Sequence, residues 1–207
     1  MSRQDQPLGM IGLGAMGRPM ALRLVRTGVP LTVFDKDTEA MAELVAAGAR
    51  PSGSPVELAS RAGTVFACLP SPEVSEAVAL GPDGVVHGTT VRHYIEMSTI
   101  GLDCIERIAT GLAVRGIATV DAPVSGGRAA VQAGRLTCMA AGPRAHFEAV
   151  ETALRGLCDR LFHVGESVGQ AQVLKLANNM LNAGNLCLAV EMILMARRAG
   201  IDEALVV

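Results

Sequence analysis

The sequence predicts an α/β protein in which a doubly wound, mostly parallel sheet is followed by one long helix. Over the first 165 residues, short apolar runs alternate with stretches of helical composition, as in parallel sheets with crossover helices. A glycine-rich turn joins the first apolar run to the first helical stretch. Residues 169–200 then form one helical stretch bounded by glycines. We therefore expect two domains, 1–165 and 166–207.

The expected elements of the first domain follow one another in a regular order. Apolar runs predict strands at 8–11, 31–34, 64–69, 94–97, 117–121, 136–141 and 161–164. Between them, helices are expected at 15–27, 38–47, 56–61, 72–80, 102–114 and 145–154, and a loop at 122–127. After the long helix, Asp202 is a plausible N-cap for a further helix over 203–207. Because two helices bury little apolar surface by themselves, residues 166–207 are expected to begin an all-helical domain that is truncated here, or to need a partner subunit.

The composition excludes several classes of function. Half of the 207 residues are hydrophobic, the net charge is −2 and no basic run occurs, which argues against nucleic acid or an anionic membrane as partner. The N-terminal residues carry no signal peptide, and polar residues interrupt every long apolar run, so we expect no membrane span. The five cysteines contain no CxxC pair and predict reduced core residues in a cytoplasmic protein, with no metal site.

The glycine-rich turn predicts a dinucleotide site. Residues 12–17 read GLGAMG and match G-x-G-x-x-G directly between a strand and a helix. In this pattern Gly12 permits the tight turn, Gly14 lets the backbone approach a pyrophosphate, and Gly17 lets the helix pack on the strand. Asp35 ends the second strand, where an acid can bind the ribose hydroxyls of NAD and repel a 2′-phosphate. Lys36, beside it, leaves room for NADP.

Two further segments end strands of the same predicted sheet. Leu69-Pro70 and Ser98-Thr99 are expected to line the crevice of the glycine turn, although the Ser-Thr pair could instead cap a helix. Residues 121–127 read DAPVSGG, in which a hydroxyl followed by two glycines suits a carboxylate-binding turn. The same residues are equally consistent with an ordinary glycine-rich loop that binds nothing. Arg128 could face a substrate anion or solvent.

The long helix carries a polar stripe on an otherwise apolar surface. Gln172, Lys175, Asn179 and Asn182 recur every three or four residues and lie on one face. The stripe faces either a ligand or water, and the helix alone does not decide between them. The chain has only two lysines, and a lysine, unlike an arginine, can lose its proton when it is buried.

Four motifs in this order resemble the β-hydroxyacid dehydrogenase family, which includes 3-hydroxyisobutyrate dehydrogenase, tartronate semialdehyde reductase and, more distantly, 6-phosphogluconate dehydrogenase. They are GLGAMGRPMA at 12–21, MSTI at 97–100, DAPVSGG at 121–127 and GQAQVLKLANN at 169–179. The resemblance implies a Rossmann-type domain, a helical domain and dimers or tetramers that interlock through it. It further implies catalysis by Lys175 and Asn179 and binding of a substrate carboxylate by Ser125, Gly126 and Gly127, with Arg128 beside them where the family has a smaller turn.

The resemblance and the strand-end motifs together give the predicted cofactor contacts. These residues are Gly12, Leu13, Gly14, Ala15, Met16, Gly17, Asp35, Lys36, Leu69, Pro70, Ser98 and Thr99.

The expected reaction is hydride transfer between NAD(P) and a small 3-hydroxy acid. Lys175 would act as general base in oxidation and as general acid in reduction, with its pKa lowered by burial. Two alternatives remain open: an idle NAD-binding or assembly module, and an imine reductase. Lys175 and Asn179 argue against the first, and imine reductases usually lack this lysine and favour NADPH.

Overall fold

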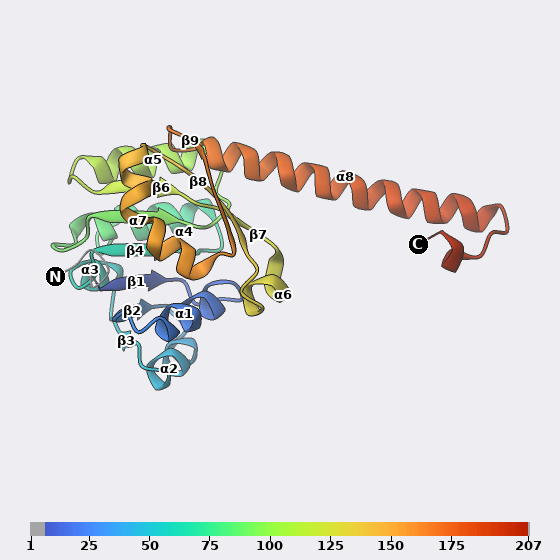
Figure 1. Cartoon of the computed structure of the whole chain (residues 1–207). Coiled ribbons are helices and arrows are strands. Elements are labelled where there is room, and N and C mark those ends of the chain that lie inside the picture. The colour runs from blue at the N-terminus through green and yellow to red at the C-terminus, as the bar shows by residue number, and fades with distance from the viewer. Residues whose placement is uncertain (1–6, 207) are drawn as a thin grey trace.

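The computed structural model describes residues 7–206, which form a nine-stranded sheet with helices on both faces and a long helix extending away from it (Figure 1). The strands are β1 (Leu8–Ile11), β2 (Leu31–Phe34), β3 (Arg50–Pro51), β4 (Thr64–Ala67), β5 (His93–Glu96), β6 (Ala118–Asp121), β7 (Val124–Ser125), β8 (Thr137–Ala141) and β9 (Arg160–Gly165). The helices are α1 (Gly17–Arg26), α2 (Thr38–Ala46), α3 (Pro55–Ala59), α4 (Pro72–Leu80), α5 (Leu102–Ala113), α6 (Gly127–Gln132), α7 (Arg144–Leu157) and α8 (Gln170–Arg198), with 3₁₀ turns η2 (Val85–His87) and η3 (Glu203–Leu205).

The strand order confirms the predicted doubly wound sheet. It runs β3-β2-β1-β4-β5-β6-β8-β7, and β9 pairs with β8. Pairing is parallel from β3 to β6 and between β8 and β9, whereas β8 is antiparallel to both β6 and β7. The order reverses direction at β1, from which the chain first builds toward β3 and then toward β6. This switch point is where ligands bind in open α/β sheets, at the carboxyl ends of the strands.

Two large apolar clusters, one on each face of the sheet, form most of the core. Helices α1, α2, α6 and α7 contribute to one cluster, and α3, α4 and α5 to the other. A small third cluster of Met139, Ala141 and Ala171 packs the start of α8 on β8. Strands β1, β4 and β5 contribute to both large clusters because successive side chains point to opposite faces. In β4, for example, Phe66 belongs to the first cluster and its neighbours Val65 and Ala67 to the second.

The structure corrects the sequence prediction in three short segments. The two-residue strand β3 has no local signal, because it is defined only by its pairing with β2. The loop expected at 122–127 contains β7, and α6 begins at its last glycine. After α8 the chain forms the 3₁₀ turn η3 rather than an α-helix, and Asp202 does accept a hydrogen bond from the Ala204 amide. Residues 1–6 and 207, on which predictions about the termini rest, lie outside the described residues.

Helix α8 leaves most of its surface uncovered by the other described elements. The sequence predicted a long helix that needs further helices or a partner subunit, and within its 29 residues the buried positions are Ala171, Gln172, Lys175 and Ala196. At about 1.5 Å per residue it is roughly 43 Å long, and most of it extends beyond the sheet (Figure 1). Its large exposed apolar side chains are Val173, Leu174, Leu176, Met180, Leu181, Leu186, Leu188, Val190, Met192, Leu194 and Met195.

By length and mean hydropathy alone, α8 is long and apolar enough to cross a membrane. No other helix among residues 7–206 is. Its first turns, however, are packed on the sheet through the buried Gln172 and Lys175. Asparagines and Glu191 interrupt the rest of its sequence. We therefore keep the prediction that α8 packs against protein rather than lipid.

The cysteines are all free thiols, and most of them lie inside the fold. Cys104, Cys138 and Cys158 are buried and Cys68 is half-buried. The prediction of a core position is wrong for Cys187, which is exposed on α8 because that part of the helix extends away from the sheet and its helices (Figure 1).

Candidate functional site

The glycine turn at the carboxyl end of β1 is shaped by close backbone approaches. Gly12 has a φ of +89°, and a Cβ there would overlap the carbonyl oxygen of Cys68. At Gly17 a Cβ would overlap the carbonyl oxygen of Gly12. Only glycine fits either position without moving the backbone, so these two residues bring β1, β4 and the start of α1 together.

Gly14 differs, because no atom of the described residues beyond its chain neighbours lies within 4 Å of the position that its Cβ would occupy. Its φ is not positive either, so neither packing nor backbone conformation requires glycine here. Three residues later, α1 begins at Gly17 with no side-chain cap and no acidic residue in its first turn. The first N–H groups of a helix have no partner within the helix and attract phosphate oxygens. The open space at Gly14 and these N–H groups fit the pyrophosphate of a dinucleotide.

Asp35 faces the same turn from the end of β2. Its Oδ2 accepts a hydrogen bond from the Leu13 amide at 2.5 Å, and its Oδ1 accepts one from the Asp37 amide at 2.9 Å. A carboxylate has about four acceptor positions, so each oxygen keeps one for a ribose hydroxyl. Lys36 is exposed beside it.

A cavity of about 460 Å³ joins these groups, within the range of small-molecule sites. It is lined by Ile11, Gly12, Gly14, Ala15, Met16, Gly17, Phe34, Asp35, Lys36, Cys68, Leu69, Pro70, Val74 and Val78. Nine of the predicted cofactor contacts are among them. The apolar wall from α4, Val74 and Val78, was not predicted, since it belongs to an ordinary amphipathic helix. Leu13 is 2% exposed and contributes to the site only through its backbone N–H.

Ser98 and Thr99 do not line this cavity. The Ser98 hydroxyl is buried and accepts a hydrogen bond from the Leu69 amide at 2.7 Å, so it holds the Leu69-Pro70 wall in place. Thr99 is exposed. Neither caps α5, because that helix begins after Gly101 without a side-chain cap. The capping alternative is therefore wrong.

A buried carboxyl group that sequence reasoning missed lies under Ser98. Glu96 is fully buried, accepts hydrogen bonds from the Ser98 amide at 3.0 Å and the Tyr94 hydroxyl at 2.9 Å, and has its pKa raised by burial. The residue ends a strand with no motif around it, so the sequence offered no signal.

The structure divides the polar stripe of α8 into a buried and an exposed part. Gln172 is fully buried and Lys175 is 9% exposed, whereas Asn179 and Asn182 are exposed. Burial lowers the pKa of Lys175. Among residues 7–206, no hydrogen bond or ion pair engages the Lys175 amine. In the first turns, therefore, the stripe faces the sheet rather than water.

Asn178, which was not a predicted site residue, links α8 to the DAPVSGG segment. Its Nδ2 donates to Ser125 Oγ at 3.5 Å. Gly126 and Gly127 follow with φ values of +128° and +67°, and no protein atom lies near the Cβ position of Gly127. Arg128 is exposed on α6. The predicted carboxylate loop and the helix that bears Lys175 are thus brought together.

Ser98 connects the two parts of the site. Its hydroxyl holds Leu69 on the cavity wall, and its carbonyl oxygen accepts a hydrogen bond from Gln172, one turn before Lys175. The cavity, Lys175 and the Ser125 loop therefore lie at the carboxyl ends of neighbouring strands β2, β1, β4, β5 and β6.

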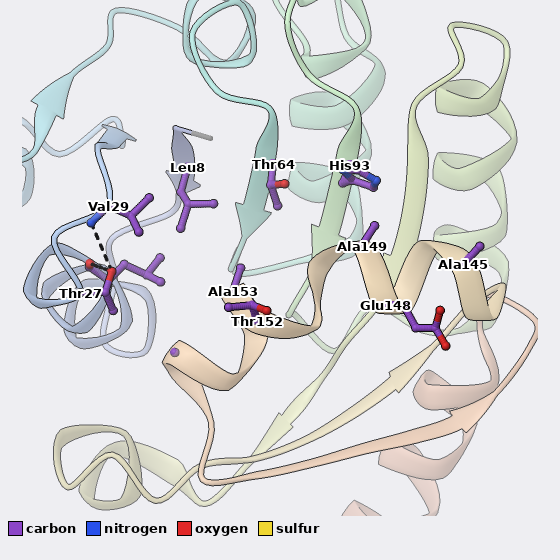
Figure 2. Close-up of a pocket in the computed structure, with 12 residues that line it drawn as sticks. Leu8, Thr27, Val29, Thr64, His93, Ala145, Glu148, Ala149, Thr152 and Ala153 are labelled. Atoms are coloured by element: carbon purple, nitrogen blue, oxygen red, sulfur yellow. Dashed lines mark hydrogen bonds between the residues drawn. The ribbon is translucent and has the colours of Figure 1, made fainter. Parts of the chain in front are cut away.

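A second hollow, of about 590 Å³, lies at the opposite ends of the strands. Figure 2 shows α7 crossing in front of Leu8, Thr64 and His93, which begin β1, β4 and β5. None of the predicted site residues lines it. Because ligands in open α/β sheets bind at the carboxyl ends, we assign the site to the smaller cavity.

Comparison with known proteins gives a consistent result. Residues 7–165 match the family model described as the NAD binding domain of 6-phosphogluconate dehydrogenase. The chain is 34% identical over 198 residues to 2-(hydroxymethyl)glutarate dehydrogenase from Eubacterium barkeri, covering 94% of this chain and 64% of that protein. The solved 3-hydroxyisobutyrate dehydrogenase of Mycobacterium tuberculosis with L-serine is 27% identical, with a TM-score of 0.89 over 96% of this chain and 67% of that one. The chain thus spans about two thirds of the length of these relatives.

Two other matches bear on the alternative functions. The cytokine-like nuclear factor N-PAC of Pongo abelii is 32% identical over 197 residues, covering 95% of this chain but 35% of that protein. An imine reductase variant from Myxococcus stipitatus, solved with NAD⁺, is 22% identical with a TM-score of 0.87, which shows a common fold alone.

The two glycines of the turn give the first testable prediction. Gly14→Ala should leave thermal stability nearly unchanged, because its Cβ meets open space, but should weaken NAD binding by about tenfold or more by intruding on the pyrophosphate. Gly17→Ala, the matched control, should destabilise the fold by about 1–3 kcal/mol because its Cβ meets backbone. Calorimetric NAD titration and thermal unfolding measure both effects. Unchanged NAD affinity in Gly14→Ala would contradict the assignment.

Asp35 gives the second prediction. Asp35→Asn should raise the dissociation constant of NAD by about tenfold, equivalent to about 1.4 kcal/mol, and narrow the preference for NAD over NADP because the repelling charge is lost. Asp37→Asn is the matched control, because Asp37 caps α2 and asparagine caps equally well. Equal effects of the two substitutions would rule out a specific contact of Asp35 with the cofactor.

Proposed function

The chain belongs to the β-hydroxyacid dehydrogenase family and carries its NAD(P)-binding domain, and we propose that it interconverts a small 3-hydroxy acid and the matching semialdehyde. The observation that carries this proposal is Lys175, a buried residue whose amine has no hydrogen-bond or ion-pair partner among residues 7–206. It lies on α8 between Gln172, which bonds to Ser98 behind the cavity wall, and Asn178, which contacts Ser125. When bound, NAD(P) supplies or accepts the hydride. The residues of the chain then bind the acid and move the proton.

Lys175 suits the proton step because burial lowers its pKa. An ordinary lysine has a pKa of about 10.4 and is almost fully protonated at neutral pH, so it is a poor base there. A lowered pKa populates the neutral amine that can take the proton from a substrate hydroxyl. In the reverse direction the ammonium returns that proton to the carbonyl oxygen.

The substrate carboxylate is proposed to bind the loop of Ser125, Gly126 and Gly127. Successive positive φ values and the open space at Gly127 expose backbone N–H groups there. Asn179 lies one turn after Lys175, and its exposed amide is free to donate to a substrate oxygen. Arg128 is exposed on α6 and is a proposed second contact for an anionic group.

A catalytically idle NAD-binding module is the second candidate, supported by the match over nearly the whole chain to N-PAC, which is described as a nuclear factor rather than as a dehydrogenase. An idle module would not need a proton-transferring amine, whereas the dehydrogenase proposal gives Lys175 a catalytic role. Screening 3-hydroxy acids and imines with NAD and NADP separates the candidates: cofactor binding without turnover favours the module, and imine turnover without alcohol oxidation favours an imine reductase.

The role of Lys175 gives the third prediction. Lys175→Ala and Lys175→Arg should both lower kcat by about 100-fold or more, because neither side chain exchanges a proton near neutrality, while NAD binding is retained. In the wild type, kcat/KM for oxidation should rise with pH through the lowered pKa of Lys175, since the base must be neutral, and the reduction rate should fall over the same range. Steady-state kinetics across pH measures both. Near-normal turnover of Lys175→Ala would refute the assignment.

The exposed side of α8 is proposed to pack against a second copy of the chain. Leu181 and Leu188 are 62% and 65% exposed and lie seven residues apart, so they share one face of the helix. An apolar face of this size on a protein in water marks an interface. We also propose that the protein is cytoplasmic and that its partners include neither nucleic acid nor a membrane.

This interface gives the fourth prediction. Sedimentation should show a dimer or larger assembly for the wild type and a shift toward monomer for the double variant Leu181→Glu/Leu188→Glu, because buried carboxylates are costly to desolvate. Val114→Glu, equally apolar and 81% exposed at the end of α5, is the control and should leave the assembly unchanged. A monomeric wild type would contradict the proposed interface.

A further inference from the structure

We propose that Gln172 and Asp121 are positioning residues that fix the start of α8, and thereby the direction in which Lys175 leaves the helix. The inference rests on the proposed function, because it gives meaning to the place of the Lys175 amine. It concerns residues that would not touch cofactor or substrate, since both side chains are fully buried.

Gln172 uses every hydrogen-bonding position of its side chain. Its Oε1 accepts from the amides of Ile100 and Gly101 at 2.8 and 3.0 Å. Its Nε2 donates to the Ser98 carbonyl oxygen at 2.9 Å and to Asp121 Oδ1 at 2.8 Å. A side-chain amide has two donors and two acceptor positions, so none is left free. A flipped amide would place its NH₂ against two N–H donors, which allows only one orientation.

Asp121 completes the attachment from the end of β6. Its Oδ2 accepts from the amides of Gly169 and Gln172 at 3.2 and 2.9 Å. These are N–H groups at the start of α8, which has no capping side chain of its own. A negative charge there is also favoured by the helix dipole. The carboxylate therefore caps α8 from another element and holds Gln172 at the same time.

Lys175 lies one turn beyond this attachment. Residues three apart on a helix share a face, so Gln172, Lys175 and Asn178 form a row. Gln172 fixes one end of the row to β5 and β6, and Asn178 contacts Ser125 at the other. Since no hydrogen bond or ion pair from the described residues holds the Lys175 amine, its direction is set by the rotation of α8 about its axis. A misplacement of a reacting group by about 1 Å can cost about 100-fold in rate.

The alternative is that Gln172 and Asp121 merely satisfy buried polar groups and stabilise the fold. Gln172→Met has nearly the same shape but loses all four hydrogen bonds. Gln170→Met is the matched control: Gln170 lies in the same helical turn, but the one hydrogen bond of its side chain within residues 7–206 is accepted from the Ser167 amide in the preceding loop. If Gln172 positions Lys175, the two variants should differ in kcat as well as in the free energy of unfolding.

The first measurement is kinetic. Gln172→Met should lower kcat by about tenfold or more while the NAD dissociation constant changes by less than about twofold, because the cavity does not include α8. Gln170→Met should keep the wild-type kcat. If Gln172→Met folds and keeps the kcat of the control, the proposal is overturned.

The second measurement does not depend on activity. The 207-residue chain has two lysines, so ¹³C-dimethylation gives one side-chain signal for the exposed Lys36 and one for the buried Lys175. In the wild type the Lys175 signal should titrate at lower pH than an ordinary lysine, whose pKa is about 10.4, since burial lowers its pKa. Gln172→Met should move this titration toward the ordinary lysine value, and Gln170→Met should not. A Lys175 titration that is the same in both variants would overturn the proposal even in an inactive protein.

A pair of compensating substitutions covers the case in which Gln172→Met fails to fold. Gln172→Glu places a carboxylate against Asp121, and adding Asp121→Asn restores a donor between the two side chains. The double variant should recover part of kcat and of the Lys175 titration relative to Gln172→Glu, because the contact with position 121 returns while the introduced carboxylate still has no donor for the Ser98 carbonyl oxygen. No recovery in a folded double variant counts against the proposal. Full activity of Lys175→Ala would instead refute the proposed function, leaving the positioning of Lys175 to be judged by its titration alone.

Discussion

The carboxylate of Asp121, buried at the end of β6 and bonded to the first N–H groups of α8, is the interaction on which the site depends. It joins the sheet to the one helix that is otherwise almost uncovered. Burial raises its pKa to about 6, against the opposing effect of these hydrogen bonds. The chain also needs glycine at the turn into α8, since Gly169 has a φ of +98° and its Cβ would overlap Leu102. The direction of α8, and with it the place of Lys175, follows from this turn and this carboxylate.

Asp35 and Asp121 show how one chemical group at the end of a strand serves two purposes. Both carboxylates accept hydrogen bonds from backbone amides of a neighbouring turn. Asp35 is half-buried and keeps acceptor positions open toward the cavity, so it can bind a ligand. Asp121 is fully buried and bonded through both oxygens, so it can only hold other residues. Solvent access, rather than residue type, separates binding from positioning.

The sheet and α8 differ in how far their apolar side chains are covered by other residues. On the sheet, two clusters enclose nearly every large side chain. On α8, apolar residues of the same types are exposed over most of the helix. Since the family relatives are about one and a half times as long as this chain, a second copy or further sequence can cover that surface. The dinucleotide cavity needs neither, because it is formed entirely by elements up to α4.

The sequence by itself determined the order of the longer strands and helices, the parallel sheet, the glycine turn and its acid. Each of these has a local pattern, such as a hydrophobic period, a helix-stop signal or a fixed spacing between residues. It also singled out Lys175, as a lysine on an apolar helix. Only the tertiary structure decided that Ser98 supports a wall rather than caps a helix, that Asn178 rather than Asn179 contacts Ser125, and that α8 is largely exposed. Gln172 and Asp121 stood in motifs, yet their partnership did not follow from them. They lie 51 positions apart, and a hydrogen bond across that separation exists only once the strand end and the helix start have met.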